Sequence, residues 1–100
     1  MHFGPNQIYH VYNRGNNKQP IFFNDANYLY FLQKIKTEWK KYADVLCYCL
    51  MPNHFHVMLV PNEEGCKNIV LANKETYMQN LSKTIGKTLS SYTKAVNIQN

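Results

Sequence analysis

An uncharged stretch in the middle of the chain places the strongest limit on the fold. Residues 45–62 contain no Asp, Glu, Lys or Arg over eighteen positions, a length at which a membrane helix becomes conceivable. Pro52 and Asn53 interrupt the stretch, and both halves are rich in residues that favour strands. The pattern therefore predicts two strands, 45–50 and 54–60, that pair as an antiparallel hairpin around residues 51–53. No membrane span is expected.

The flanking segments predict one more strand and two helices. Residues 8–13 have the aromatic and β-branched composition of a strand. A first helix is expected from a cap at Asn24 or Asp25 to about residue 43. Its apolar residues recur at spacings of three and four: Tyr28, Phe31, Leu32, Ile35, Trp39 and Tyr42. A second helix is expected from residue 74 or 76 to the end of the chain. Its apolar stripe comprises Tyr77, Leu81, Ile85, Leu89, Tyr92 and Val96.

The order strand, helix, strand, strand, helix predicts the fold class. It is typical of an α+β fold, a ferredoxin-like sandwich in which an antiparallel sheet carries its helices on one face. One hundred residues are enough for a single domain, expected over 1–100.

The charge and the cysteines narrow the possible partners. Eleven Lys and Arg oppose six Asp and Glu, which gives a net charge of +5 and favours an anionic partner, nucleic acid first. A small basic domain often has no such partner. Cys47, Cys49 and Cys66 have no zinc-ribbon spacing, so reduced thiols in a cytosolic protein are expected.

Two histidines in the predicted hairpin are the main candidates for chemistry. His54 and His56 are two residues apart, so strand alternation places both on one face, about 7 Å apart along the strand, with Phe55 in the core. Two imidazoles so placed can reach one metal ion. The spacing alone also fits two half-buried or surface histidines without a metal. Cys47 and Cys49 share a face of the partner strand, so a Cys₂His₂ zinc site is a further alternative to buried free cysteines.

Three segments carry a resemblance to a known family, the HUH-type single-tyrosine transposases, and within it the REP-associated tyrosine transposase branch. The segments read I-Y-H-V-Y-N-R-G-N-N-K-Q-P-I-F, L-M-P-N-H-F-H-V-M-L-V and N-L-S-K-T-I-G-K-T-L-S-S-Y-T-K-A-V-N. The last of these looks like the helix that follows the hairpin in this family. Together the segments cover nearly all of the chain in order.

The resemblance implies a DNA transposase of the bacterial cytoplasm that acts as a homodimer. His54 and His56 would bind Mg²⁺ or Mn²⁺, which polarises the scissile phosphate of single-stranded DNA, often at the foot of a hairpin. A tyrosine hydroxyl would attack, leaving a 5′-phosphotyrosine and a free 3′-OH. Imidazole is a less typical ligand for Mg²⁺ than carboxylate, so a third, oxygen ligand is expected.

The chain departs from the family pattern at the nucleophile. The tyrosine of this branch lies in a later helix, ahead of an H-x-N-P-like segment that does not occur before Asn100. The chain is therefore expected to lack the C-terminal segment with the nucleophile. Tyr92 is the one late candidate for a catalytic substitute, but it continues the apolar stripe, which favours a core aromatic residue. The alternative function is a catalytically incomplete remnant that binds single-stranded DNA or hairpins.

Several polar residues are candidates for DNA contacts, each with a plainer interpretation. A strand histidine is often simply packed, Asn and Arg are common in turns, and a row of lysines is often a solvated helix face. The candidates are His10, Asn13, Arg14, the pair Asn16 and Asn17, Lys83, Lys87 and Lys94.

The apolar stripe of the last helix also needs a cover, which is compatible with a dimer.

Overall fold

The fold was analysed in a computed structural model. It describes residues 2–15 and 19–99, and the side chains of residues 2–15 and 19–95. The elements, in chain order, are β1 (Tyr9–Arg14), α1 (Asp25–Thr37), the 3₁₀ helix η2 (Trp39–Lys41), β2 (Ala43–Met51), β3 (His54–Pro61), α2 (Glu63–Cys66), β4 (Asn68–Leu71), β5 (Lys74–Gln79) and α3 (Asn80–Gln99).

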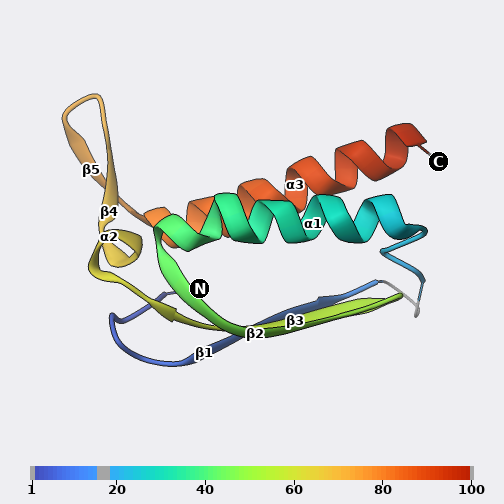
Figure 1. Cartoon of the computed structure of the whole chain (residues 1–100). Coiled ribbons are helices and arrows are strands. Elements are labelled where there is room, and N and C mark those ends of the chain that lie inside the picture. The colour runs from blue at the N-terminus through green and yellow to red at the C-terminus, as the bar shows by residue number, and fades with distance from the viewer. Residues whose placement is uncertain (1, 16–18, 100) are drawn as a thin grey trace.

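The main sheet has three antiparallel strands in the order β1-β3-β2. Helices α1 and α3 lie side by side over one face of this sheet and run in opposite directions (Figure 1). The other face carries no helix among the described residues. This arrangement confirms the predicted α+β sandwich with its helices on one face.

The predicted hairpin is formed by β2 and β3. Met51 pairs with His54, so Pro52 and Asn53 make a two-residue turn. The Asn53 carbonyl accepts a hydrogen bond from the Gly15 amide at 2.9 Å, so the segment after β1 is tied to the tip of the hairpin. No helix among the described residues is long and apolar enough to cross a membrane.

The core lies between the sheet and the two long helices. Phe55 and Val57 of β3 are 2% and 0% exposed, and the ring of Phe55 lies 4.8 Å from that of Phe31 in α1, centroid to centroid. The fully buried Trp39 donates a hydrogen bond from Nε1 to Thr88 Oγ1 of α3 at 2.9 Å. The Phe31–Phe55 packing thus joins α1 to the sheet, and the Trp39–Thr88 hydrogen bond joins η2 to α3 within the helix layer.

The first helix begins as predicted and ends earlier. Asn24 is its N-cap, and the side-chain oxygen accepts from the Asn27 amide at 3.0 Å. The α-helix ends at Thr37, and the chain continues through η2 to Lys41. The apolar stripe is continuous across both segments, which explains why the sequence predicted one helix to about residue 43.

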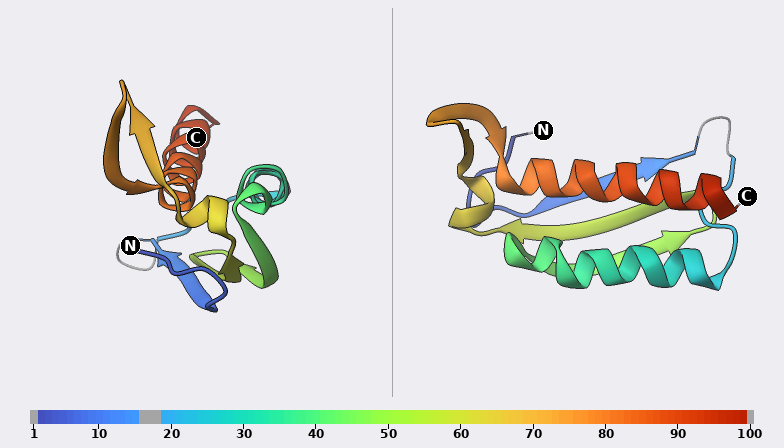
Figure 2. Two further views of the ribbon diagram at one scale, coloured as in Figure 1. Left: turned by 90° about the vertical axis from the view of Figure 1, so that its left-hand side faces the viewer. Right: turned by 90° about the horizontal axis from the view of Figure 1, so that it is seen from above.

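The predicted start of the second helix is wrong. Residues 74–79 form β5, which pairs with β4 in a separate two-stranded sheet, and α3 begins at Asn80. Ala72 and Asn73 make the turn with positive φ of 51° and 64°, the backbone that a tight two-residue hairpin requires. The hairpin projects from the body of the domain (Figure 2), and Tyr77 is 98% exposed on it. Tyr77 therefore does not belong to the apolar stripe.

The rest of that stripe is covered within the chain. Leu81, Ile85 and Tyr92 are at most 7% exposed, and Leu89 is half-buried. The side chain of Val96 lies outside the described residues. The described part of this stripe therefore needs no second copy as a cover, and the dimer rests on the resemblance alone.

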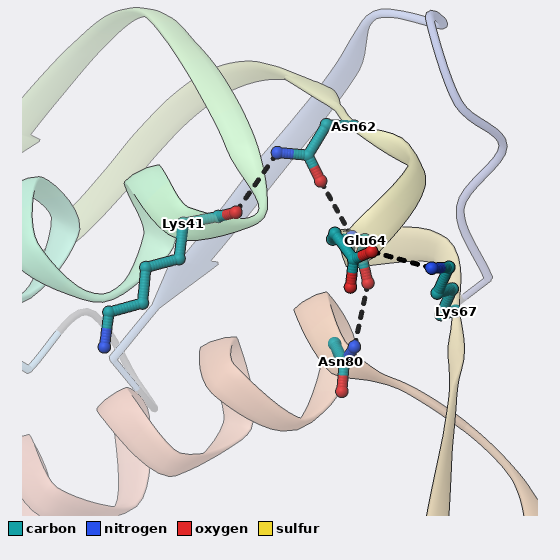
Figure 3. A network of polar contacts seen from close by, with 6 residues as sticks. Lys41, Asn62, Glu64, Lys67 and Asn80 are labelled. Carbon is teal, nitrogen blue, oxygen red and sulfur yellow. Dashed lines mark hydrogen bonds and ion pairs between the residues drawn. The ribbon is translucent and has the colours of Figure 1, made fainter.

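A polar network joins the helix layer to α2 (Figure 3). Asn62 caps α2 by accepting from the Gly65 amide at 2.8 Å, and its Nδ2 donates to the Lys41 carbonyl at 3.1 Å. Asn80 Nδ2 donates to the Glu64 carbonyl at 2.8 Å. A side chain on Gly65 would collide with the Tyr42 carbonyl. The end of η2 and the start of α3 are thus fixed to one small helix.

Candidate functional site

His54 and His56 share one face of the central strand, as predicted. Their neighbours Phe55 and Val57 point into the core beneath the helices, so the two histidines lie on the open face of the sheet. Both are half-buried, and their ring centroids are 5.0 Å apart with the planes at 82°. The strand therefore presents two imidazoles side by side, within reach of solvent.

A hydrogen bond fixes the proton of His54. Its Nδ1 lies 2.6 Å from the Oδ1 of Asn53 in the hairpin turn. An amide oxygen only accepts, so Nδ1 donates, and the lone pair of a neutral His54 is on Nε2. A partner of this kind is what orients a metal-ligating histidine. His54 is therefore prepared to donate electrons from Nε2.

His10 of β1 is brought against His56. Its Nε2 lies 2.7 Å from His56 Nδ1, and the two rings stack with centroids 4.8 Å apart. Partial burial first, and then the charges of His10, His54 and Arg14, lower the pKa of His56. A lowered pKa keeps His56 neutral at physiological pH, which is the form that binds metals. The sequence analysis gave His10 as a candidate DNA contact, and the structure places it against the histidine pair.

Tyr12 joins the same site, and the sequence analysis missed it. Tyr12 pairs with His56 and Arg14 pairs with His54 across β1 and β3. The Tyr12 ring is tilted against the His10 ring at 5.0 Å between centroids and stacks on the His56 ring at 6.1 Å, and Tyr12 is 63% exposed. Strand alternation already put Tyr12 and Arg14 on the face of His10. The missing information was the register between two strands far apart in sequence.

The β2 side of the site carries sulfur. Cys49 pairs with His56 and Cys47 with Met58, and both cysteines are exposed rather than buried. Within residues 2–15 and 19–99, no group of three or more His, Cys, Asp or Glu side chains is arranged to hold a metal ion. These residues therefore do not form the alternative Cys₂His₂ zinc site.

Tyr92 does not join the histidines. It packs on Phe31 at 5.5 Å between ring centroids, and Phe31 covers the opposite face of the sheet. Its hydroxyl donates to the Ile21 carbonyl at 2.5 Å. Burial, and to a smaller degree Tyr28, raises the pKa of Tyr92 to about 12. A catalytic role for Tyr92 beside His54 and His56 is therefore not supported, because its hydroxyl lies on the helix side and already has a partner.

The other candidate DNA contacts are spread over the molecule. Asn13 pairs with Phe55 and so lies on the helix side, where its Oδ1 accepts from the Arg14 amide at 2.9 Å. Lys83 and Lys87 line a groove between α1 and α3, and Lys94 is exposed on α3. Asn16 and Asn17 lie outside the described residues. The open face thus gathers His10 and Arg14 around the histidine pair, and the lysines form a different surface.

Searches of protein-family models, curated proteins and solved structures found no match for this chain. The chemistry of the site therefore has to be argued from its side chains. Two adjacent imidazoles can bind a cation, an exposed Tyr12 can hold a planar base, and Arg14 can pair with a phosphate.

Proposed function

We propose that this chain is the metal- and DNA-binding domain of an HUH-type DNA transposase, which cleaves and rejoins single-stranded DNA. One observation carries the proposal. Two imidazoles stand side by side on an open sheet face, next to an exposed aromatic ring and a guanidinium group. This combination suits a phosphate between bases better than it suits a small neutral molecule.

The side chains fit a divalent cation as a pair of nitrogen ligands. His54 and His56 would hold Mg²⁺ or Mn²⁺, and Mn²⁺ accepts imidazole more readily. When bound, the cation supplies a Lewis acid that stabilises negative charge on a phosphate. The described His, Cys, Asp and Glu side chains provide no third ligand for the cation. Water and phosphate oxygens are therefore the ligands that complete the proposed site.

The proposed reaction needs a tyrosine nucleophile. The tyrosyl oxygen forms a bond to phosphorus while the bond to the 3′ oxygen breaks, and the 3′ oxygen takes up a proton. The phosphotyrosyl ester conserves the energy of the broken bond, so the 3′-OH can reverse the step without ATP. In this chain Arg14 would pair with the phosphate, and the ring of Tyr12 would stack on a neighbouring base.

Metal binding tests the core of the proposal. We expect Mn²⁺ titration, followed by electron paramagnetic resonance, to show one site in the wild-type protein. His54→Ala and His56→Ala should each weaken binding tenfold or more, because each removes one ligand of few. His2→Ala is the matched control, since His2 is exposed and outside the sheet. Indistinguishable titrations of the wild type and His54→Ala would contradict the proposal.

A second candidate function is a module that binds single-stranded DNA or hairpins without cleaving it. The packing of Tyr92 favours it, since its hydroxyl is hydrogen-bonded away from the histidines. Incubation with Mn²⁺ and labelled single-stranded DNA separates the two candidates. A transposase forms a covalent adduct that survives denaturing electrophoresis, and peptide mass spectrometry locates the tyrosine. DNA binding without any adduct would favour the second candidate.

A homodimer belongs to the proposal through the resemblance alone. Analytical ultracentrifugation at high micromolar concentration tests it directly. A monomer at that concentration would remove the dimer and leave the metal and DNA proposals unchanged.

A further inference from the structure

A basic groove runs between the two long helices. Its volume is about 310 Å³. Four lysines line it, two from α1 and η2 and two from α3: Lys34, Lys41, Lys83 and Lys87. Glu38 is the one acidic residue among its described lining residues. Helices α1 and α3 pack antiparallel (Figure 2), so lysines about fifty residues apart in the sequence line one groove.

Most of this positive charge is not compensated within the described residues. Glu38 lies 3.5 Å from Lys41, and both side chains are well exposed, so the pair is weak. No described carboxylate lies within ion-pair distance of Lys34, Lys83 or Lys87. Lys34 instead lies 5.6 Å from the ring centre of Tyr30. A cluster of unpaired like charges attracts anions.

The groove has a repeating pattern of charge. Lys83 and Lys87 are one helical turn apart, about 6 Å along α3, and Lys34 of α1 and Lys41 of η2 line the same groove. Thr84 of α3 also lines the groove and carries a hydroxyl. Lysines together with hydroxyls are common partners of nucleic-acid phosphates. Several spaced cations suit a chain of phosphates better than a single small anion.

Local contacts hold one end of the groove in place. The carbonyl of Lys41 is bound by Asn62, while its ammonium end points the other way (Figure 3). Trp39 donates a hydrogen bond to Thr88, which lines the groove, and so joins η2 to α3. The two helices therefore present their lysines from a fixed frame.

We propose that this α1–α3 groove binds the phosphate backbone of a nucleic acid at a second site, separate from the histidine face. His54 and His56 point away from the helices, so the segment in the groove differs from the segment at the histidines. The inference rests on the proposed function only in that both assign DNA as the partner.

Salt dependence of DNA binding tests the groove. The test variant is the double substitution Lys83→Gln with Lys87→Gln. The matched control is Lys36→Gln with Lys40→Gln, which removes the same charge from exposed positions outside the groove. Fluorescence anisotropy with labelled single-stranded and hairpin oligonucleotides is measured between about 50 and 200 mM salt, a range over which phosphate contacts change affinity strongly.

The groove predicts a specific change in slope. Each lost phosphate contact lowers the slope of log affinity against log salt by about 0.7 on single strands and about 0.9 on duplex DNA. The test variant should lose about 1.4 on single strands, taking two contacts at that value, and about tenfold in affinity. The control should change much less. Equal losses in both variants, or wild-type binding by the test variant, would overturn the inference.

Two further arms separate the outcomes. Polyglutamate is added as a competitor and compared with unlabelled DNA at equal concentration of negative charge. If polyglutamate displaces the oligonucleotide at a lower concentration than the DNA does, an acidic peptide is the better ligand and the inference is overturned. His54→Ala should keep the full salt slope of the groove. If His54→Ala binds Mn²⁺ as the wild type does while the slope difference between the lysine variants is intact, the result counts against the proposed function only. If His54→Ala loses Mn²⁺ binding but the two lysine variants have the same slope, the result counts against the groove only.

Discussion

The two faces of the three-stranded sheet are built from alternating residues of the same strands, yet they differ in almost every property. On the helix side Phe55 is 2% exposed and packs on Phe31. On the open side Tyr12 is 63% exposed and stacks only on histidines. One face stabilises the fold through buried apolar area. We expect the other face to contribute little to folding, which leaves it free to carry chemistry.

Polar groups follow the same division. On the helix side the buried polar side chain of Thr88 is paired with Trp39, as burial demands. On the open side the Nε2 of His54 has solvent or a ligand available. The comparison teaches that stability and the candidate function are separable in this domain, because they occupy opposite faces.

Truncating one aromatic residue on each face should give the largest contrast. Phe55→Ala should lower the free energy of unfolding by about 3–5 kcal/mol, since it leaves a cavity under the helices. Tyr12→Ala should change it by less than about 0.5 kcal/mol, as is usual for exposed positions, and should weaken single-stranded DNA binding through lost stacking. Chemical denaturation and fluorescence anisotropy measure the two effects.

The contrast fails if Tyr12→Ala unfolds the domain as readily as Phe55→Ala. The open face would then be part of the core of a larger assembly. His54→Ala serves as a second control on the open face, and its denaturation curve should match that of the wild type.

Removing the hydroxyl of Tyr92 should have a smaller effect, confined to the helix side. Tyr92→Phe loses the hydrogen bond to the Ile21 carbonyl and should cost about 1 kcal/mol of stability. The raised pKa of about 12 means that the folded state holds the phenol proton more tightly than the unfolded state, whose pKa is near 10.0. The stabilisation of the fold that comes from this proton is fully present below pH 10 and is lost as the pH rises to 12.

Thermal unfolding at several pH values checks this prediction. The melting temperature of the wild type should fall between pH 10 and 12, and that of Tyr92→Phe should fall less over the same range. Any DNA adduct that the wild type forms should persist in Tyr92→Phe. Loss of the adduct without loss of stability would instead make Tyr92 the nucleophile.

The smallest expected effect concerns the protonation of His56 on the open face. Its pKa is below 6.5 because of partial burial first and the neighbouring positive charge of His10 second. His10→Ala should move the pKa of His56 up, and NMR titration of the ring proton on Cε1 measures the shift. A lowered pKa favours the neutral form in the fold, so this contribution to stability is present above pH 6.5 and lost below it. An unchanged titration would show that His10 does not influence His56.

Local patterns were enough to predict the parts of the fold that depend on near neighbours. Pro52 and Asn53 fixed the hairpin turn, and Asn24 predicted the cap of α1. The β4–β5 hairpin was missed because its turn uses Ala72 and Asn73, a pair without the glycine that usually accompanies positive φ. The segment 74–79 also continued the helical spacing of α3, and pairing with β4 outweighed that preference.

The sequence by itself determined that His54 and His56 share a face and that Phe55 lies opposite them, because side chains alternate along a strand with a period of two. Only the tertiary structure decided what meets them. The register of β1 on β3 brings His10, Tyr12 and Arg14 to the histidines, and the antiparallel packing of α1 on α3 brings Lys34 to Lys87. Alternation is a property of each strand alone, whereas register and helix packing depend on how the whole core is buried, which no local spacing contains.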